Sequence, residues 1–156
     1  LMDHAVPVLL ELKIPAIFFI VADACGKSDS WYRAEEKVMD WSHLRVLVKL
    51  GFTIGSHTLT HPALDEIPPE TAWREIVDSR KQLEDKLGVK VDLFAYPKGQ
   101  YTPALCDVVR EAGYRVGWAT RKGDGSPFAQ RRFRVSANTG TLGFAAKVLK
   151  ARLGYY

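Results

Sequence analysis

Two histidines four positions apart, His57 and His61, are the strongest chemical signal in the sequence. They lie in the segment Ser-His-Thr-Leu-Thr-His-Pro at residues 56–62 and are two of the four histidines in the chain. Neutral imidazole is a common metal ligand, and zinc binds it readily. The spacing therefore indicates a metal site, although two loop histidines with structural or solvent-facing roles would give the same pattern.

The helical zinc-protease motif His-Glu-x-x-His has the same spacing but does not fit this segment. Thr58 stands where that motif needs its general-base glutamate, and Pro62 directly after the second histidine would cut a helix short. We expect instead a loop that folds back and brings both rings to one ion. The hydroxyls of Thr58 and Thr60 could pin such a loop through local backbone hydrogen bonds.

The elements around this motif alternate between helix and strand. Apolar periodicity, glycines and prolines predict helices at residues 3–13, 40–50, 69–88, 102–113 and 140–153, and strands at 14–22, 52–56, 91–96, 115–120 and 132–137. This order predicts an α/β domain with a parallel sheet, open or closed into a barrel. His57 directly follows a strand, and the carboxyl ends of parallel strands are where such folds carry their chemistry.

The composition is that of a single globular domain. The 156 residues are 47% hydrophobic and 26% charged, and no apolar run is long enough to span a membrane. The formal charge of +4 comes mostly from scattered basic residues, without a motif that could read nucleic-acid bases. Cys25 and Cys106 do not form a CxxC pair. We therefore expect no nucleic-acid partner, no membrane span and no disulfide framework.

Several stretches resemble the polysaccharide deacetylase family, the NodB homology domain of carbohydrate esterase family 4. They are Ile-Gly-Ser-His-Thr-Leu-Thr-His-Pro at 54–62, the helix and strand within 5–19, and Phe-Ala-Tyr-Pro-Lys-Gly at 94–99. Arg-Phe-Arg-Val at 132–135 is similar to the strand that ends many of these domains. The match covers nearly the whole chain, 1–156, as one domain, and the histidine motif is its most specific part.

The resemblance implies a distorted (β/α) barrel with an Asp-His-His metal triad, in which His57 and His61 supply the two histidines. Zinc is the expected metal, with cobalt, nickel or iron as alternatives. Such a metal polarises a water molecule and the amide carbonyl. The resemblance also implies that the backbone N–H of Lys98 stabilises the oxyanion, while Tyr96 and Pro97 shape the wall of the groove.

Three aromatic residues follow or end predicted strands and are candidates for stacking on sugar faces. They are Tyr96, Tyr101 and Trp118. For Trp118, packing in the core or at the rim explains the pattern at least as well.

One part of the family pattern has no counterpart here. The family's Thr-Phe-Asp-Asp-Gly segment carries the general base and the third metal ligand, and it would fall a few residues before Leu1. We therefore expect an N-terminally truncated domain without its first strand, and little activity, since loss of a general base costs about 10²–10⁴ in rate. Asp3 is better explained as a first-turn helix acid. Ala95 stands where many members have an arginine that orients the base.

The implied function is metal-dependent removal of N-acetyl groups from an amino-sugar polymer, such as peptidoglycan, a chitin-like chain or poly-N-acetylglucosamine. Two alternatives stay open: a deacylase of a small amide or lipid-linked amino sugar, and a non-catalytic glycan-binding domain. The expected partner is an N-acetylated glycan, while the oligomeric state is not predicted. The resemblance alone indicates an extracytoplasmic location in a bacterium.

Overall fold

The computed structural model describes residues 1–28, 37–120, 123–136 and 138–154. Its elements in chain order are α1 (Ala5–Glu11), β1 (Ile17–Ile20), η1 (Ala22–Ala24), α2 (Trp41–Lys49), β2 (Thr53–Ser56), α3 (Pro69–Leu87), β3 (Leu93–Ala95), η2 (Pro97–Gly99), α4 (Pro103–Glu111), β4 (Val116–Trp118) and α5 (Thr141–Arg152). Helices and strands alternate, as the sequence predicts.

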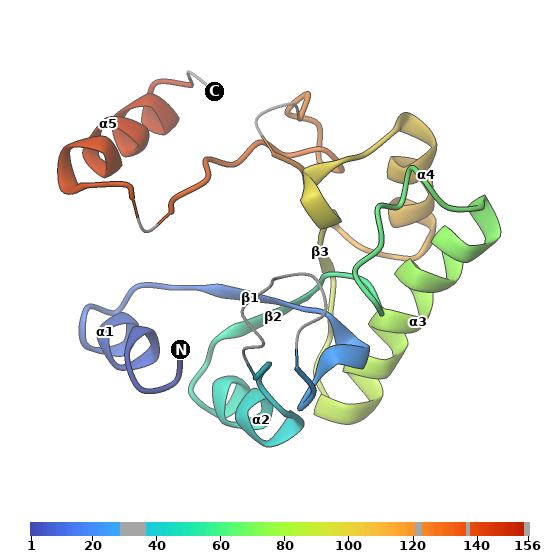
Figure 1. Cartoon of the computed structure of the whole chain (residues 1–156), viewed down its shortest axis with the longest axis horizontal. Coiled ribbons are helices and arrows are strands. Elements are labelled where there is room, and N and C mark those ends of the chain that lie inside the picture. The colour runs from blue at the N-terminus through green and yellow to red at the C-terminus, as the bar shows by residue number, and fades with distance from the viewer. Residues whose placement is uncertain (29–36, 121–122, 137, 155–156) are drawn as a thin grey trace.

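The described strands form one parallel sheet in the order β1-β2-β3-β4 (Figure 1). Ile20 pairs with Ser56, Ser56 with Phe94, and Ala95 with Trp118. These pairs bring the carboxyl ends of the strands to the same edge of the sheet. The α/β architecture is therefore confirmed, whereas the described strands form an open sheet and closure into a barrel stays a prediction.

Gly55 in β2 shows why this sheet tolerates only a small residue at its centre. A Cβ placed on Gly55 would lie 2.5 Å from the ring of Phe19 in β1, far inside van der Waals contact. The missing side chain lets the Phe19 ring lie across β2, and its other neighbour is Trp118, with ring centroids 5.5 Å apart. Packing across the sheet thus depends on a glycine directly before the histidine segment.

The core lies between the sheet and the helices α2 and α3, while Figure 1 shows α5 apart from them. Phe94 and Tyr96 are fully buried at its centre, together with Leu44 and Leu47 of α2. By contrast, α5 has no buried residue, and its Leu142 is 88% exposed. The histidine segment is therefore carried by the well-packed part of the molecule.

The ends of α2 follow the sequence signals. The Asp40 side chain accepts hydrogen bonds from the backbone N–H groups of Ser42 and His43, and His43 returns the contact in a capping box. Gly51 follows the helix with φ of +83°, a left-handed conformation that glycine adopts without a steric cost. The helix therefore begins and ends where the sequence predicts it, within residues 40–50.

One sequence expectation needs correction. The strand predicted at 132–137 does not form within its described residues, 132–136. The chain before it makes one isolated parallel β-bridge, between Trp118 and Gln130. Trp73 of α3 is 39% exposed, whereas Ile76 and Leu83 of the same helix are buried. No described helix is long and apolar enough to cross a membrane.

Candidate metal and substrate site

The histidine segment leaves β2 and turns back on itself. The His57 N–H donates to the Ile20 oxygen at 2.8 Å, which continues the sheet, and then Thr58 and His61 both adopt left-handed backbone conformations, with φ of 72° and 68°. Such conformations cost energy for residues other than glycine and persist only where the surroundings hold them. The turn brings the two imidazole rings together, with centroids 4.9 Å apart.

Local hydrogen bonds fix part of this turn. The fully buried Thr58 hydroxyl accepts the backbone N–H of His61 at 3.0 Å, and the Thr58 carbonyl accepts the N–H of Ala22 at 3.0 Å. The predicted role of the Thr58 hydroxyl is confirmed. Thr60 differs from the prediction, because its hydroxyl bonds to a side chain of α3 rather than to a local backbone group.

That side chain is Glu75, which holds the middle of the turn. Its Oε2 accepts the backbone N–H groups of Leu59 and Thr60, each at 2.9 Å, and its Oε1 accepts the Thr60 hydroxyl at 2.6 Å. Only 8% of Glu75 is exposed. The sequence analysis missed this residue. The signal that could have found it is its position beside Ile76 on the inward face of α3, because a buried glutamate without a partner would be costly.

His57 is held in one tautomer. Its Nδ1 lies 2.5 Å from the carbonyl oxygen of Ala95, and because a carbonyl can only accept, the proton sits on Nδ1 and the Nε2 lone pair is available. Burial lowers the pKa of His57 to about 4; the bond to Ala95 opposes this shift, and the charges of His61 and Arg132 add smaller decreases. His57 is therefore neutral at pH 7, as a metal ligand must be.

His61 shares these electrostatics. Burial and then the charge of Lys98 lower its pKa below the ordinary value. Both imidazoles thus lie within reach of a cation, Arg132 for His57 and Lys98 for His61. Among the described residues neither cation forms an ion pair, so the surroundings of the rings are electropositive and suit a developing negative charge.

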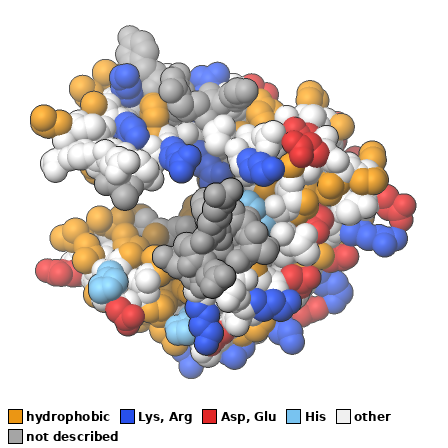
Figure 2. All heavy atoms as spheres, in the orientation of Figure 1, with side chains coloured by type: hydrophobic (Ala, Val, Ile, Leu, Met, Phe, Trp, Pro, Cys, Tyr) orange, Lys and Arg blue, Asp and Glu red, His pale blue; other side chains and the backbone are white. Residues whose placement is uncertain are grey.

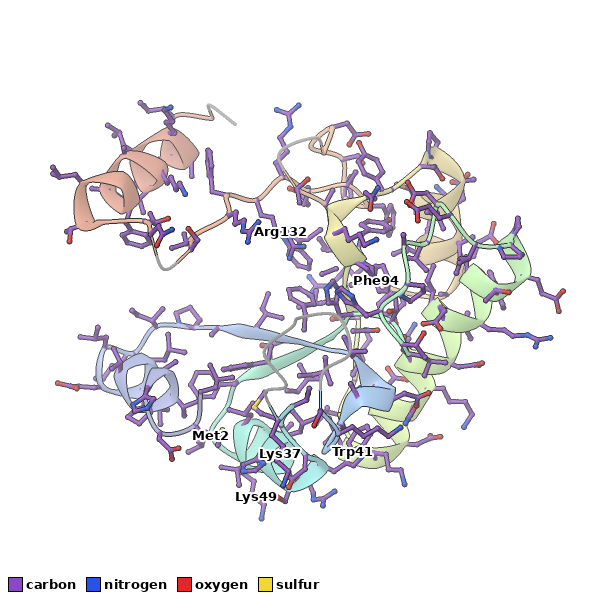
Figure 3. The ribbon with its side chains drawn as sticks, in the orientation of Figure 1. Met2, Lys37, Trp41, Lys49, Phe94 and Arg132 are labelled. Carbon is purple, nitrogen blue, oxygen red and sulfur yellow. The ribbon has the colours of Figure 1, made fainter. Side chains whose placement is uncertain are left out.

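Arg132 comes from the segment that follows β4. In Figure 3 it appears beside β3, the strand that carries Phe94, and burial lowers the pKa of its guanidinium. Figure 2 shows several Lys and Arg side chains gathered on this part of the surface. The role of Arg132 was not predicted, because its segment was expected only to form a strand.

The segment after β3 carries the predicted oxyanion group. Lys98 has φ of 55°, a left-handed conformation, and its backbone N–H donates to no backbone acceptor among the described residues. Pro97 is buried beneath it. Ala95, the partner of His57, is the last residue of β3, so Lys98 follows it in the chain by three residues.

Tyr96 departs from its prediction as a sugar contact. Its side chain has no exposed surface, and its hydroxyl donates to the Phe128 oxygen at 2.9 Å; burial strongly raises its pKa. A ring without exposed surface cannot stack on a sugar, so Tyr96 supports the wall from behind. Tyr101 rests against it, with centroids 5.8 Å apart, and keeps a partly exposed face. Trp118 is partly exposed too, and packs on Phe19.

The described residues do not bring a third ligand to the two histidines. No group of three or more His, Cys, Asp or Glu side chains suited to a metal occurs within residues 1–28, 37–120, 123–136 and 138–154. Asp3 is exposed next to α1 and does not join the histidines. The arrangement therefore provides two neutral nitrogen donors in an electropositive setting.

Comparisons with known proteins agree with this geometry. Residues 1–117 match the family model described as polysaccharide deacetylase. The chain is 26% identical over 150 residues to YxkH of Bacillus subtilis (strain 168), a protein assigned by its name to the polysaccharide deacetylases. That alignment covers 94% of this chain and 51% of YxkH, so the chain spans about half of that relative.

Solved structures share the fold. The Streptococcus pyogenes deacetylase PplD, in complex with acetate, superposes with a TM-score of 0.79 at 19% identity over 93% of this chain and 63% of PplD. IcaB from Ammonifex degensii gives a TM-score of 0.75 at 25% identity over 92% of this chain and 66% of IcaB.

Proposed function

Because the chain belongs to the polysaccharide deacetylase family, we propose that its two histidines hold the metal of a hydrolase that removes N-acetyl groups from an amino-sugar polymer. The single observation that carries this proposal is the pair of imidazoles held 4.9 Å apart by a strained turn at the carboxyl end of β2. A turn with two left-handed non-glycine residues is expensive, which argues for a site rather than for an incidental loop.

The donor set fits a divalent metal, and zinc is the metal we propose. Both imidazoles are held neutral by burial, and the Ala95 carbonyl leaves Nε2 of His57 free to bind. A carbonyl partner on the other ring nitrogen is the usual way in which proteins orient a ligating histidine. When bound, the metal would supply Lewis-acid polarisation of the amide carbonyl and of a water molecule.

The chain's own residues contribute orientation and charge. Ala95 keeps the proton on Nδ1 of His57, and Glu75 keeps the turn closed. We assign the backbone N–H of Lys98 to the oxyanion of the tetrahedral intermediate, since it has no competing backbone acceptor among the described residues. Removing one such donor typically costs about 10²–10³ in kcat.

Two measurements test the proposal. Zinc titration calorimetry is done on this chain and on His57→Ala, His61→Ala and the control His4→Ala, which alters an exposed histidine outside the site. Acetate release from N-acetylglucosamine oligomers is measured with the protein that carries this chain. We expect His57→Ala and His61→Ala to lose zinc and acetate release together, while His4→Ala keeps both.

Other results would change the conclusion. Zinc retained by the double variant His57→Ala/His61→Ala would overturn the assignment of the two ligands. Oligomer binding without zinc and without acetate release would favour the non-catalytic glycan-binding alternative. Acetate release from small N-acetylated amides but not from oligomers would favour the small-amide alternative. We also propose an extracytoplasmic location, which cell fractionation would test.

A further inference from the structure

The positive charge of the protein is concentrated in its C-terminal segment. Residues 125–156 contain six of the 22 Lys and Arg residues of the chain and none of its 18 Asp and Glu residues. Residues 1–124 hold the other 16 basic side chains and all 18 acidic ones, so their formal charge is slightly negative. The whole basic surplus of the protein therefore belongs to the segment that includes α5.

One face of α5 carries a row of leucines. With 3.6 residues per turn, Leu142, Leu149 and the C-cap residue Leu153 lie within about 40° of one another around the helix axis. These three side chains are 88%, 59% and 60% exposed. Single exposed leucines are ordinary on a protein surface, but three on one face of a helix form an apolar row that the described chain leaves open to solvent.

The opposite face of α5 is turned toward the chain itself. The Lys147 ammonium donates to the carbonyl of Arg134 and to the hydroxyl of Thr139, both in the segment that leads into the helix. Lys147 and Ala151 are half-buried, whereas the other residues of α5 are exposed. The leucine row therefore points away from the segment that holds the helix, and Figure 1 shows α5 apart from the sheet and its covering helices.

Two cations flank the leucine row. Lys150 and Arg152 lie on either side of it, each about 80° from its centre around the helix axis. Neither side chain forms an ion pair with a residue that the structure describes. Figure 2 shows Lys and Arg side chains next to hydrophobic ones where Figure 1 places α5. Helices that lie in the interface of a lipid bilayer combine apolar and basic side chains in this way.

The combination of leucines and cations favours a lipid surface over other partners. An anionic polymer would pair with Lys150 and Arg152 but would leave the leucines in water. A second copy of α5 would cover the leucines but would bring the cations of both copies together. An anionic bilayer accepts the leucines among its acyl chains and the cations at its headgroups.

The length of α5 fixes how it would meet such a bilayer. Its 12 residues extend about 18 Å at 1.5 Å per residue, which is less than the hydrocarbon core of about 30 Å. The helix is therefore too short to cross a membrane and would lie along its surface. The long stems of Lys150 and Arg152 would then let the charged groups reach the phosphates while the leucines stay inserted.

We propose that α5 binds the surface of an anionic lipid bilayer, with Leu142, Leu149 and Leu153 below the headgroups and Lys150 and Arg152 at the lipid phosphates. This inference goes beyond the proposed hydrolase and does not depend on it. Binding of this kind would hold the histidine site close to a membrane.

The test is sedimentation of this chain with vesicles of phosphatidylcholine, alone or mixed with phosphatidylglycerol. We expect binding only to the mixed vesicles, and release at high salt. Removing two cations should weaken binding about tenfold or more, since each contributes about fivefold near an anionic surface. Removing two leucines should weaken it about tenfold or more. The two variants are Lys150→Gln/Arg152→Gln and Leu142→Gln/Leu149→Gln.

Matched controls make the same changes on the exposed side of α2. They are Arg45→Gln/Lys49→Gln for the charges and Val46→Gln/Leu50→Gln for the apolar surface, since Val46 and Leu50 are exposed as well. Both controls should keep full vesicle binding. Because α5 has no buried residue, its variants should keep the urea midpoint and the zinc affinity of the original chain.

Three results would overturn the proposal. The first is no binding to the mixed vesicles, and the second is equal binding to both kinds of vesicle. The third is binding that the α5 variants leave unchanged; if Leu142→Gln/Leu149→Gln then also converts a dimer to a monomer in sedimentation equilibrium, a second copy of the chain covers the leucines instead. None of these results bears on zinc binding or acetate release, so the proposed function is judged separately.

Discussion

Replacing Glu75 by alanine should loosen the histidine turn without touching either imidazole. The carboxylate accepts two backbone N–H groups at 2.9 Å and one hydroxyl at 2.6 Å, so the change removes three hydrogen bonds at once. The two N–H donors would be left without their acceptor, and Thr60, which is exposed, can turn its hydroxyl to water. No other described carboxylate contacts these donors.

The magnitude follows from those donors. A buried donor left unsatisfied costs about 1–3 kcal/mol, so two partly buried ones predict a loss of about 2–4 kcal/mol in the free energy of unfolding. Glu75→Gln keeps one acceptor oxygen and should cost about 1 kcal/mol. We also expect Glu75→Ala to lower zinc affinity about tenfold, because groups that orient metal ligands have effects of this size.

Urea unfolding and zinc calorimetry on the same samples provide the assay. The matched control is Glu70→Ala, on the same helix, where the carboxylate is exposed and pairs only with Arg74. Exposed pairs contribute about 0–1 kcal/mol, so this control should unfold close to the original protein and bind zinc equally. If Glu75→Ala unfolds at the same urea concentration as Glu70→Ala and keeps full zinc affinity, the carboxylate does not hold the turn.

Three further predictions concern the fold around the site. Gly55→Ala should lower the free energy of unfolding by about 1–3 kcal/mol through overpacking against Phe19, and Phe19→Leu should recover part of that loss in urea unfolding. The Asp40 side chain accepts hydrogen bonds from the Ser42 side chain and from the backbone N–H of His43, and these bonds lower the pKa of Asp40 to about 2. The cap therefore stabilises the fold fully above about pH 4, and this stabilisation is lost as the pH falls through 2. Acid unfolding of Asp40→Asn should lack that pH dependence. Tyr114→Phe removes a hydroxyl that donates to the Ile76 oxygen at 2.9 Å and should cost about 1 kcal/mol in the same assay, whereas no change would exclude a stabilising bond.

The histidine site could be located from the sequence because its signals are local. His57 and His61 are four residues apart, they follow a short strand, and Thr58 bonds within the same turn. The caps of α2 are local in the same sense, since Asp40 contacts residues two and three positions away. Contacts between residues this close in the chain can be recognised from the sequence alone.

The groups that orient the site are not local, and the sequence did not reveal them. Ala95 contacts His57 across 38 positions, and Glu75 contacts Leu59 across 16. Both contacts depend on which strands pair and on which face of α3 turns inward. Arg132 was likewise misjudged, since its segment does not form the expected strand among its described residues.

The sequence by itself determined the alternation of helices and strands, the position of the histidine pair and the resemblance that points to deacetylation. The tertiary structure decided which aromatic ring is buried: Tyr96 and Tyr101 look alike in the sequence, but Tyr96 packs on Phe94 without exposed surface, whereas Tyr101 stays partly exposed. The reason is physical, because burial and charge at a site are sums over neighbours that are distant in the chain and meet only when the sheet forms.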